Sequence, residues 1–238
     1  LVPYLFGWEK STLAFDVALH FGTLLAVLVV FFVDLWHLLT GAYEKITQKK
    51  NSFDNTMFWY LVVATIPGAV LGFLLDDVIE NIFREKIWLI ATALAVMGIL
   101  IYIGDKWADN HYRIETDFKH ISFSQALIIG LSQALAIIPG FSRSGTTILT
   151  ARLVGLSKTA ATKFTFLLSV PIIAGATILE IGHIALTWET IVGVLVSFLV
   201  GLFSIKFLLN YVKKHDFSIF AIYRIIFAII ILVKYFCF

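Results

Sequence analysis

Long apolar stretches separated by short polar segments dominate this chain. Uncharged stretches lie at residues 17–33, 55–75, 87–104, 121–142, 164–179 and 190–205, and a last apolar run, 217–238, is interrupted only by Arg224 and Lys234. A helix that crosses a bilayer needs roughly 20 apolar residues, and fewer where flanking side chains reach the interface. The pattern therefore predicts an all-α, polytopic membrane protein with six full transmembrane helices and one irregular segment.

The irregular segment is the stretch from residue 121 to residue 157. Pro139 lacks an N–H and is followed by Gly140, a pair that ends a helix. One apolar arm, 121–138, precedes this break, and a second arm, 146–156, is too short to cross a membrane alone. We therefore expect a re-entrant helical hairpin over 121–157. Because non-helical backbone survives at membrane depth only inside protein or beside water, the polar tip should face a cavity.

An internal repeat relates the two halves of the chain. The pattern Leu-x-Gly-x-x-Lys occurs at residues 5–10 and again at 153–158, and residues 58–78 resemble residues 191–212. Each half holds three spans, an odd number, so the halves should have opposite orientations, as in many transporters. We predict one integral membrane domain, 1–238, built from a first inverted repeat, 1–120, and a second, 121–238. By the same offset, the hairpin of the first repeat is expected upstream of residue 1.

Composition and charge narrow the class of protein further. The chain is 60% hydrophobic with a mean hydropathy of +0.92, and its net charge of +2 argues against a nucleic-acid partner. Lys and Arg fall mostly on the side that holds residues 41–54 and 105–120, which predicts that these loops are cytoplasmic and that loops 76–86 and 183–189 are outside. The single Cys237 allows no intrachain disulfide, and the loop histidines show no metal-ligand spacing.

The hairpin tip carries the polar motif PGFSRSGTT, residues 139–147. Ser142 can cap a helix that begins at Arg143, and a helix N-terminus favours an anion. The guanidinium of Arg143 is a planar fork suited to phosphate, and Gly140 and Gly145 let the backbone approach a ligand closely. The motif therefore predicts a phosphate-binding cradle. The alternative is that Arg143 ties the hairpin to neighbouring carbonyls, while Arg224 is expected to be structural, with its head reaching the cytoplasmic interface.

The motif also carries a family resemblance. PGFSRSGTT, preceded by GLSQALAIIPG and followed by FTFLLSVPIIAGA, resembles the bacterial undecaprenyl-pyrophosphate phosphatase family of the BacA type, and FDVALHFGTLLAVLVVFF extends the resemblance into the first half. It implies an inverted repeat whose two re-entrant hairpins meet at a pocket open to the outer face of the bacterial plasma membrane. It also implies hydrolysis of the lipid diphosphate to the monophosphate, which recycles the carrier of cell-wall precursors and underlies resistance to bacitracin.

Site residues follow from the motif and the resemblance together. We expect catalytic roles for Ser142, Arg143 and Ser144 and substrate-binding roles for Gly140, Gly145, Thr146, Thr147 and Gln133. The last is the counterpart, in the second hairpin, of a family motif with two glutamates and a histidine. The resemblance implies a divalent cation, Mg²⁺ or Ca²⁺, with ligands in that motif upstream of residue 1, so no metal ligand is predicted in this chain.

Two other classes of function are weighed against the phosphatase. A transporter or flippase for a lipid phosphate fits an inverted repeat with a midplane anion site equally well. A purely structural membrane subunit leaves the polar tip unexplained. The partners expected for the phosphatase are a lipid diphosphate and membrane lipid, and a homodimer is one candidate assembly.

Overall fold

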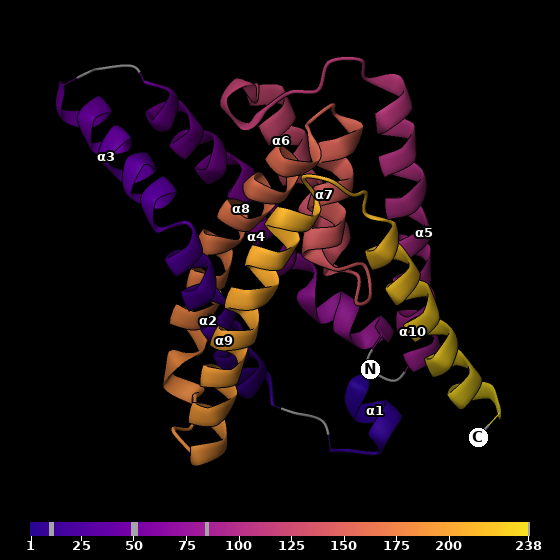
Figure 1. The fold of residues 1–238 in the computed structure, drawn as a ribbon. Helices are drawn as coiled ribbons and strands as arrows, with labels where there is room; N and C mark the ends of the chain where they lie inside the picture. Colours follow the sequence, from indigo (N-terminus) through magenta and orange to yellow (C-terminus); the bar gives the residue numbers. More distant parts are fainter. Residues whose placement is uncertain (10–11, 49–51, 84–85, 238) are drawn as a thin grey trace.

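The computed structural model describes residues 1–9, 12–48, 52–83 and 86–237, and these residues form a bundle of helices (Figure 1). Lys10, Lys49, Lys50 and Arg84, which enter the charge count above, lie outside the described residues. The helices are α1 (Val2–Phe6), α2 (Leu13–Val30), α3 (Phe32–Gln48), α4 (Phe53–Phe83), α5 (Ile87–His111), η1 (Phe118–His120), α6 (Phe123–Ser132), η2 (Gln133–Ile137), α7 (Arg143–Leu153), α8 (Lys158–Glu180), η3 (Ile181–His183), α9 (Trp188–Tyr211) and α10 (Ser218–Cys237).

Six of these helices are long and apolar enough to cross a membrane. They are α2, the Phe53–Leu75 part of α4, α5, α8 extended to His183, α9 and α10. The described residues form no strand, only an isolated parallel bridge between Thr116 and Leu156. The prediction of an all-α polytopic membrane protein with six spans is confirmed.

The segments between the spans are more helical than their polarity suggested. α3 continues to Gln48, α4 to Phe83 and α5 to His111, so most of the expected loops 41–54, 76–86 and 105–120 is helix. The first span, α2, ends at Val30, before the end of the uncharged stretch 17–33, because the chain bends at Phe31 between α2 and α3. Loop boundaries drawn where charges begin are wrong here, since a helix can continue into water on an amphipathic face.

Spans from the two halves of the chain pack against each other. α2 lies along α9, and α5 lies along α10. Helices approach closely at Gly22 and Gly130, where an added Cβ would lie 2.4 Å from the Val194 carbonyl oxygen and 2.5 Å from the Ala64 carbonyl oxygen, respectively. The division into two inverted repeats stays a prediction. One local likeness accords with it: Gly7 and Gly155, aligned by the repeat, have φ angles of 69° and 91°.

The segment 121–157 forms a helical hairpin whose two ends meet. α6 and η2 lead to the tip and α7 returns from it, and Figure 1 shows the tip loop turned back into the bundle. At the base, the Thr116 N–H donates to the Gly155 carbonyl at 2.8 Å, and the Ser157 N–H donates to the Thr116 carbonyl at 2.9 Å. With 11 residues, α7 is about 16 Å long, roughly half of a hydrocarbon core. That the hairpin enters a membrane and returns stays a prediction.

Candidate active site

The hairpin tip is a sharp turn that holds two unusual backbone conformations. Gly140 has φ +103°, and a Cβ there would lie 2.4 Å from the Ile90 carbonyl oxygen on α5, so only glycine fits. Ser142 has φ 62° and is the one non-glycine residue with positive φ among those described. Such a conformation costs roughly 1–3 kcal/mol and is typical of functional sites.

Ser142 caps α7 as the sequence predicts. Its Oγ accepts a hydrogen bond from the Gly145 N–H at 3.4 Å, and its carbonyl accepts one from the Thr146 N–H at 3.0 Å. The first N–H groups of a helix have no acceptor within it, so those of Arg143 and Ser144 stay available to a ligand. The positive end of α7 therefore points into the interior of the bundle.

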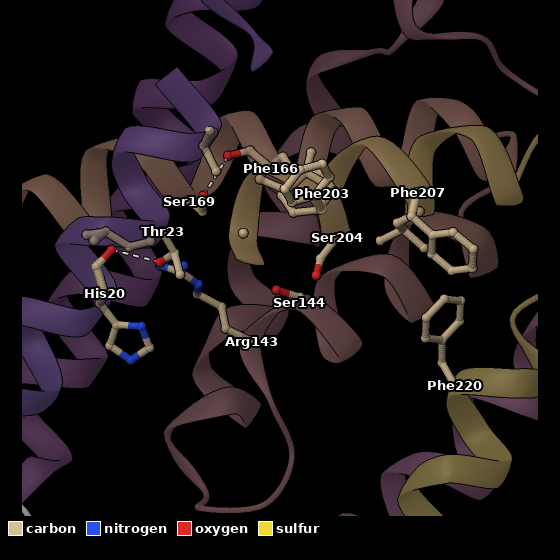
Figure 2. Close-up of a pocket in the computed structure, with 15 residues that line it drawn as sticks. His20, Thr23, Arg143, Ser144, Phe166, Ser169, Phe203, Ser204, Phe207 and Phe220 are labelled. Carbon is tan, nitrogen blue, oxygen red and sulfur yellow. Dashed lines mark hydrogen bonds between the residues drawn. The ribbon is translucent and has the colours of Figure 1, made fainter. Parts of the chain in front are cut away.

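Arg143 is half-buried, and its guanidinium makes no hydrogen bond or ion pair with the part of the chain that the structure describes. Figure 2 shows its side chain extending from the start of α7 towards Thr23 and His20 of α2. A guanidinium shielded from water without an anionic partner is costly, so this position favours an anionic ligand. A guanidinium with five donors and no acceptor among the described residues is the strongest functional signal in the structure.

Two adjoining cavities meet at Arg143. They have volumes of about 640 Å³ and about 410 Å³, and both are lined by His20, Arg143, Ser144 and Ile173. Ser144 of α7 and Ser204 of α9 point toward each other across the larger cavity (Figure 2), and neither hydroxyl has a hydrogen-bond partner among the described residues. The cavities thus offer a cation and two hydroxyl donors to one ligand group.

The polar lining of the larger cavity comes from the start of α7 and from α2, α8 and α9, namely Arg143, Ser144, His20, Thr23, Ser169 and Ser204. Beyond Ser204 its lining turns to aromatic side chains from α8, α9 and α10, namely Phe166, Phe203, Phe207 and Phe220. A ligand that fits such a cavity has an anionic head and an apolar body.

Three residues with predicted substrate contacts lie away from the cavities. Thr146 and Thr147 are each 1% exposed, and their hydroxyls donate to the carbonyls of Ser142 and Arg143. Gln133 is 3% exposed, and its amide nitrogen donates to the Ala64 carbonyl of α4 at 2.9 Å. These side chains stabilise the hairpin in the structure, and direct contact with substrate stays a prediction for them.

The two glycines have a packing role that the sequence did not reveal. The Cα of Gly140 lies against α5, and a Cβ at Gly145 would lie 3.2 Å from a guanidinium nitrogen of Arg224. Arg224 does not reach for the interface: it turns inward and donates to the Phe141 carbonyl at 3.4 Å. The expectation that it snorkels is wrong, because an unpaired carbonyl at the tip offers its guanidinium a partner inside the bundle. Its structural role is consistent with this contact.

Sequence reasoning missed the contribution of α2. His20 and Thr23 line the cavity opposite Arg143, but only Arg143 carried a recognisable motif. The signal available was their spacing of three, which places both on one face of a helix whose only other charged or polar side chain is Asp16. An ionisable residue within a membrane span is by default a functional candidate.

The described residues do not by themselves form a site for a divalent cation. No three histidine, cysteine, aspartate or glutamate side chains converge within 1–9, 12–48, 52–83 and 86–237. Arg143 is the only charged residue that lines both cavities, and a guanidinium repels a metal ion. We therefore derive no step of the reaction through a metal.

Comparison with known proteins places this geometry in a family. A family model described as bacitracin resistance protein BacA matches residues 1–230. The chain belongs to the BacA family. It is 43% identical to a protein of Caldicellulosiruptor bescii named undecaprenyl-diphosphatase, with 99% of this chain and 88% of the relative covered. A protein of the same name from Desulforudis audaxviator is 44% identical, with 98% and 87% covered. The resemblance inferred from the hairpin motif is confirmed.

Proposed function

We propose that this BacA-family protein hydrolyses undecaprenyl diphosphate to undecaprenyl phosphate and inorganic phosphate, and so recycles the lipid carrier of cell-wall synthesis. The observation that carries the proposal is Arg143, a half-buried guanidinium with no acceptor among the described residues, at the polar end of a cavity whose other end is aromatic. The names of the relatives support the same activity.

The geometry suggests how the chain binds this substrate. Oxygens of the diphosphate accept hydrogen bonds from the Arg143 fork, the Ser144 hydroxyl and the N–H groups at the start of α7. The first isoprenoid units lie along the aromatic part of the cavity, on Phe203 and Phe220. Head and tail are thus held by opposite ends of one cavity, which orients the phosphorus atoms relative to α7.

Arg143 also suits the chemistry of the reaction. A nucleophile, either water or a side chain such as a serine of the motif, attacks the terminal phosphorus while the bond from that phosphorus to the bridging oxygen breaks; negative charge grows on the bridging oxygen and is spread over the oxygens of the transferring group. Donors already in place for these oxygens lower the barrier, because they need not reorganise during the reaction. Ser142 contributes indirectly, since its strained backbone aims the start of α7 at the cavity.

Phosphate release from a prenyl diphosphate by the purified full-length protein tests the proposal. We expect release from farnesyl diphosphate and none from the Arg143→Ala variant at the same folded fraction. Failure of the wild type to release phosphate, together with counterflow of labelled lipid phosphate in proteoliposomes, would favour the transporter instead.

Three further parts of the proposal rest on the family resemblance. We propose that the pocket opens to the outer face of the bacterial plasma membrane, that a divalent cation is required, and that the protein forms a homodimer. Labelling with impermeant thiol reagents tests the first statement. Chelation with EDTA followed by return of Mg²⁺ or Ca²⁺ tests the second, and light scattering of the detergent-solubilised protein tests the third.

A further inference from the structure

A second arginine of the hairpin is buried for a different reason. Arg152, in the last turn of α7, is 1% exposed. Its Nε donates to Asp105 at 2.7 Å, one terminal nitrogen donates to Asp109, and the other donates to Glu115 and to the Leu156 carbonyl. This uses the whole fork of the guanidinium, whereas Arg143, nine residues earlier on the same helix, uses none of it within the described chain.

The partners of Arg152 belong to the elements that surround the hairpin. Asp105 and Asp109 lie one turn apart at the end of α5, and Glu115 lies in the segment that leads to α6. The second carboxylate oxygen of Asp105 accepts the backbone N–H of Phe217 at 3.1 Å, immediately before α10. Arg152 and Asp105 therefore tie α5, α7 and the start of α10 together at one end of the bundle.

The base of the hairpin is braced by other contacts as well. The Tyr112 hydroxyl donates to the Leu153 carbonyl at 2.8 Å, and the Gln125 side chain donates to the Val154 carbonyl at 2.9 Å. Among the described residues, the tip motif 139–147 is reached from outside the hairpin by two side-chain bonds: Arg224 donates to the Phe141 carbonyl at 3.4 Å, and the Thr165 hydroxyl donates to the Thr147 hydroxyl at 3.0 Å. The end of α7 at Arg152 therefore has more bonds to neighbouring elements than its start, and the direction of α7 is set mainly there.

We propose that Arg152 is a positioning residue for the phosphate cradle: it fixes the tilt of α7 and thereby the placement of Arg143 and Ser144 at the other end of that helix. The inference rests on the proposed function. Nine residues of helix span about 13 Å, so a tilt of roughly 5° at Arg152 moves the tip by about 1 Å. A misplacement of that size at a reacting centre can cost about a hundredfold in rate.

Lysine is the informative replacement, because it keeps the charge that balances the three carboxylates. A single ammonium cannot hold Asp105, Asp109 and Glu115 in the fixed geometry of a guanidinium. Removal of the charge, as in Arg152→Met, would leave the buried carboxylate of Asp105 without its ion pair and would destabilise the fold. Lys106→Gln is the matched control: it breaks the ion pair between Lys106 and Asp216 at the same end of α5 without touching α7.

The experiment compares the wild type, Arg152→Lys and Lys106→Gln as full-length proteins in detergent. We measure kcat and KM for farnesyl diphosphate, the melting temperature, and hydrogen exchange of the peptide that covers residues 139–147. For Arg152→Lys we expect kcat to fall about 10- to 100-fold with KM changed less than about threefold, and faster exchange at the tip. For Lys106→Gln we expect kcat within about twofold, whatever its melting temperature.

Two outcomes would overturn the inference. One is an Arg152→Lys protein with unchanged kcat, and the other is a loss of kcat that tracks the melting temperature equally in both variants, which is what a merely stabilising role predicts. If Arg152→Lys does not fold, Glu115→Gln serves in its place, because it loosens one arm of the fork from the exposed side. An inactive wild type would instead count against the proposed function.

Discussion

Replacing Arg143 with lysine should abolish most activity and leave the fold intact. The guanidinium makes no hydrogen bond or ion pair within the described chain, so the substitution leaves no buried partner unsatisfied. Lysine keeps the positive charge beside His20 and Ser144 but offers a point charge in place of a planar fork. The substitution should therefore lower activity, because the geometry for binding phosphate is lost, without lowering stability, because no internal contact is lost.

The size of the effect follows from the contact that is lost. A charge-assisted hydrogen bond to the transferring phosphoryl group is worth about 3 kcal/mol in the transition state, which corresponds to about a hundredfold in kcat/KM. The free energy of unfolding should change by less than about 0.5 kcal/mol, as for substitutions that break no internal contact. Arg224→Lys should cost less than about tenfold, because an ammonium can still donate to the Phe141 carbonyl.

The assay is phosphate release from farnesyl diphosphate by full-length protein in detergent, with melting temperatures measured on the same samples. Arg143→Lys should lose activity at an unchanged melting temperature, whereas Arg152→Lys should change both. Full activity of Arg143→Lys would refute the phosphate-binding role. A large drop in its melting temperature would show that Arg143 has a structural partner after all.

Three more predictions concern the tip, the charged end of the bundle and the topology. Gly140→Ala should lower the free energy of unfolding by at least about 2 kcal/mol, because φ is +103° and a Cβ would lie 2.4 Å from the Ile90 carbonyl oxygen. Gly72→Ala is the control: a Cβ there would meet nothing within 4 Å, so this variant should be neutral or stabilising in a thermal melt. Lys106 lowers the pKa of the Asp216 carboxyl from 3.8 to about 2. The stability that this ion pair contributes is therefore present above pH 4 and is lost as the pH falls through 2. Acid unfolding curves of the wild type and Lys106→Gln should converge below pH 2. In a Cys237→Ala background, an impermeant reagent applied to intact cells should label a cysteine at Leu186 and not one at Thr47; labelling of residue 47 from outside would reverse the orientation.

Hydropathy predicted the spans because the free-energy cost of placing a charged side chain in lipid depends on that residue alone and not on distant parts of the chain. The same is true of the cap at Ser142, since its acceptor and the Gly145 donor are three residues apart. Side-chain directions at the site could not be predicted in this way. Whether Thr147 faces a ligand or its own backbone depends on how α7 packs against α8, where the Thr165 hydroxyl donates to it at 3.0 Å.

The contacts of Arg152 at the base of the hairpin could not be predicted from the sequence either. Asp105 and Asp109 were placed in a polar loop, because nothing near them in the sequence required a buried partner. In the structure α5 continues through both of them to His111, about two turns beyond residue 104. Their carboxylates contact Arg152, which lies 47 and 43 residues away along the chain. A contact over that separation leaves no local pattern, so loop polarity was a reasonable but wrong guide to where α5 ends.

Three arginines lie within or against the hairpin, and what each one finds as an acceptor separates their roles. Arg152 has three carboxylates and a carbonyl, Arg224 has one carbonyl, and Arg143 has no acceptor in the described chain. Burying a guanidinium is unfavourable unless its donors are satisfied, so the deficit at Arg143 is one that a phosphate group would fill. Composition and hydropathy do not distinguish the three arginines, because each lies in an apolar stretch where an ionisable residue is by default a functional candidate. The count of acceptors distinguishes the residue that we propose binds substrate from the two that we propose hold it in place.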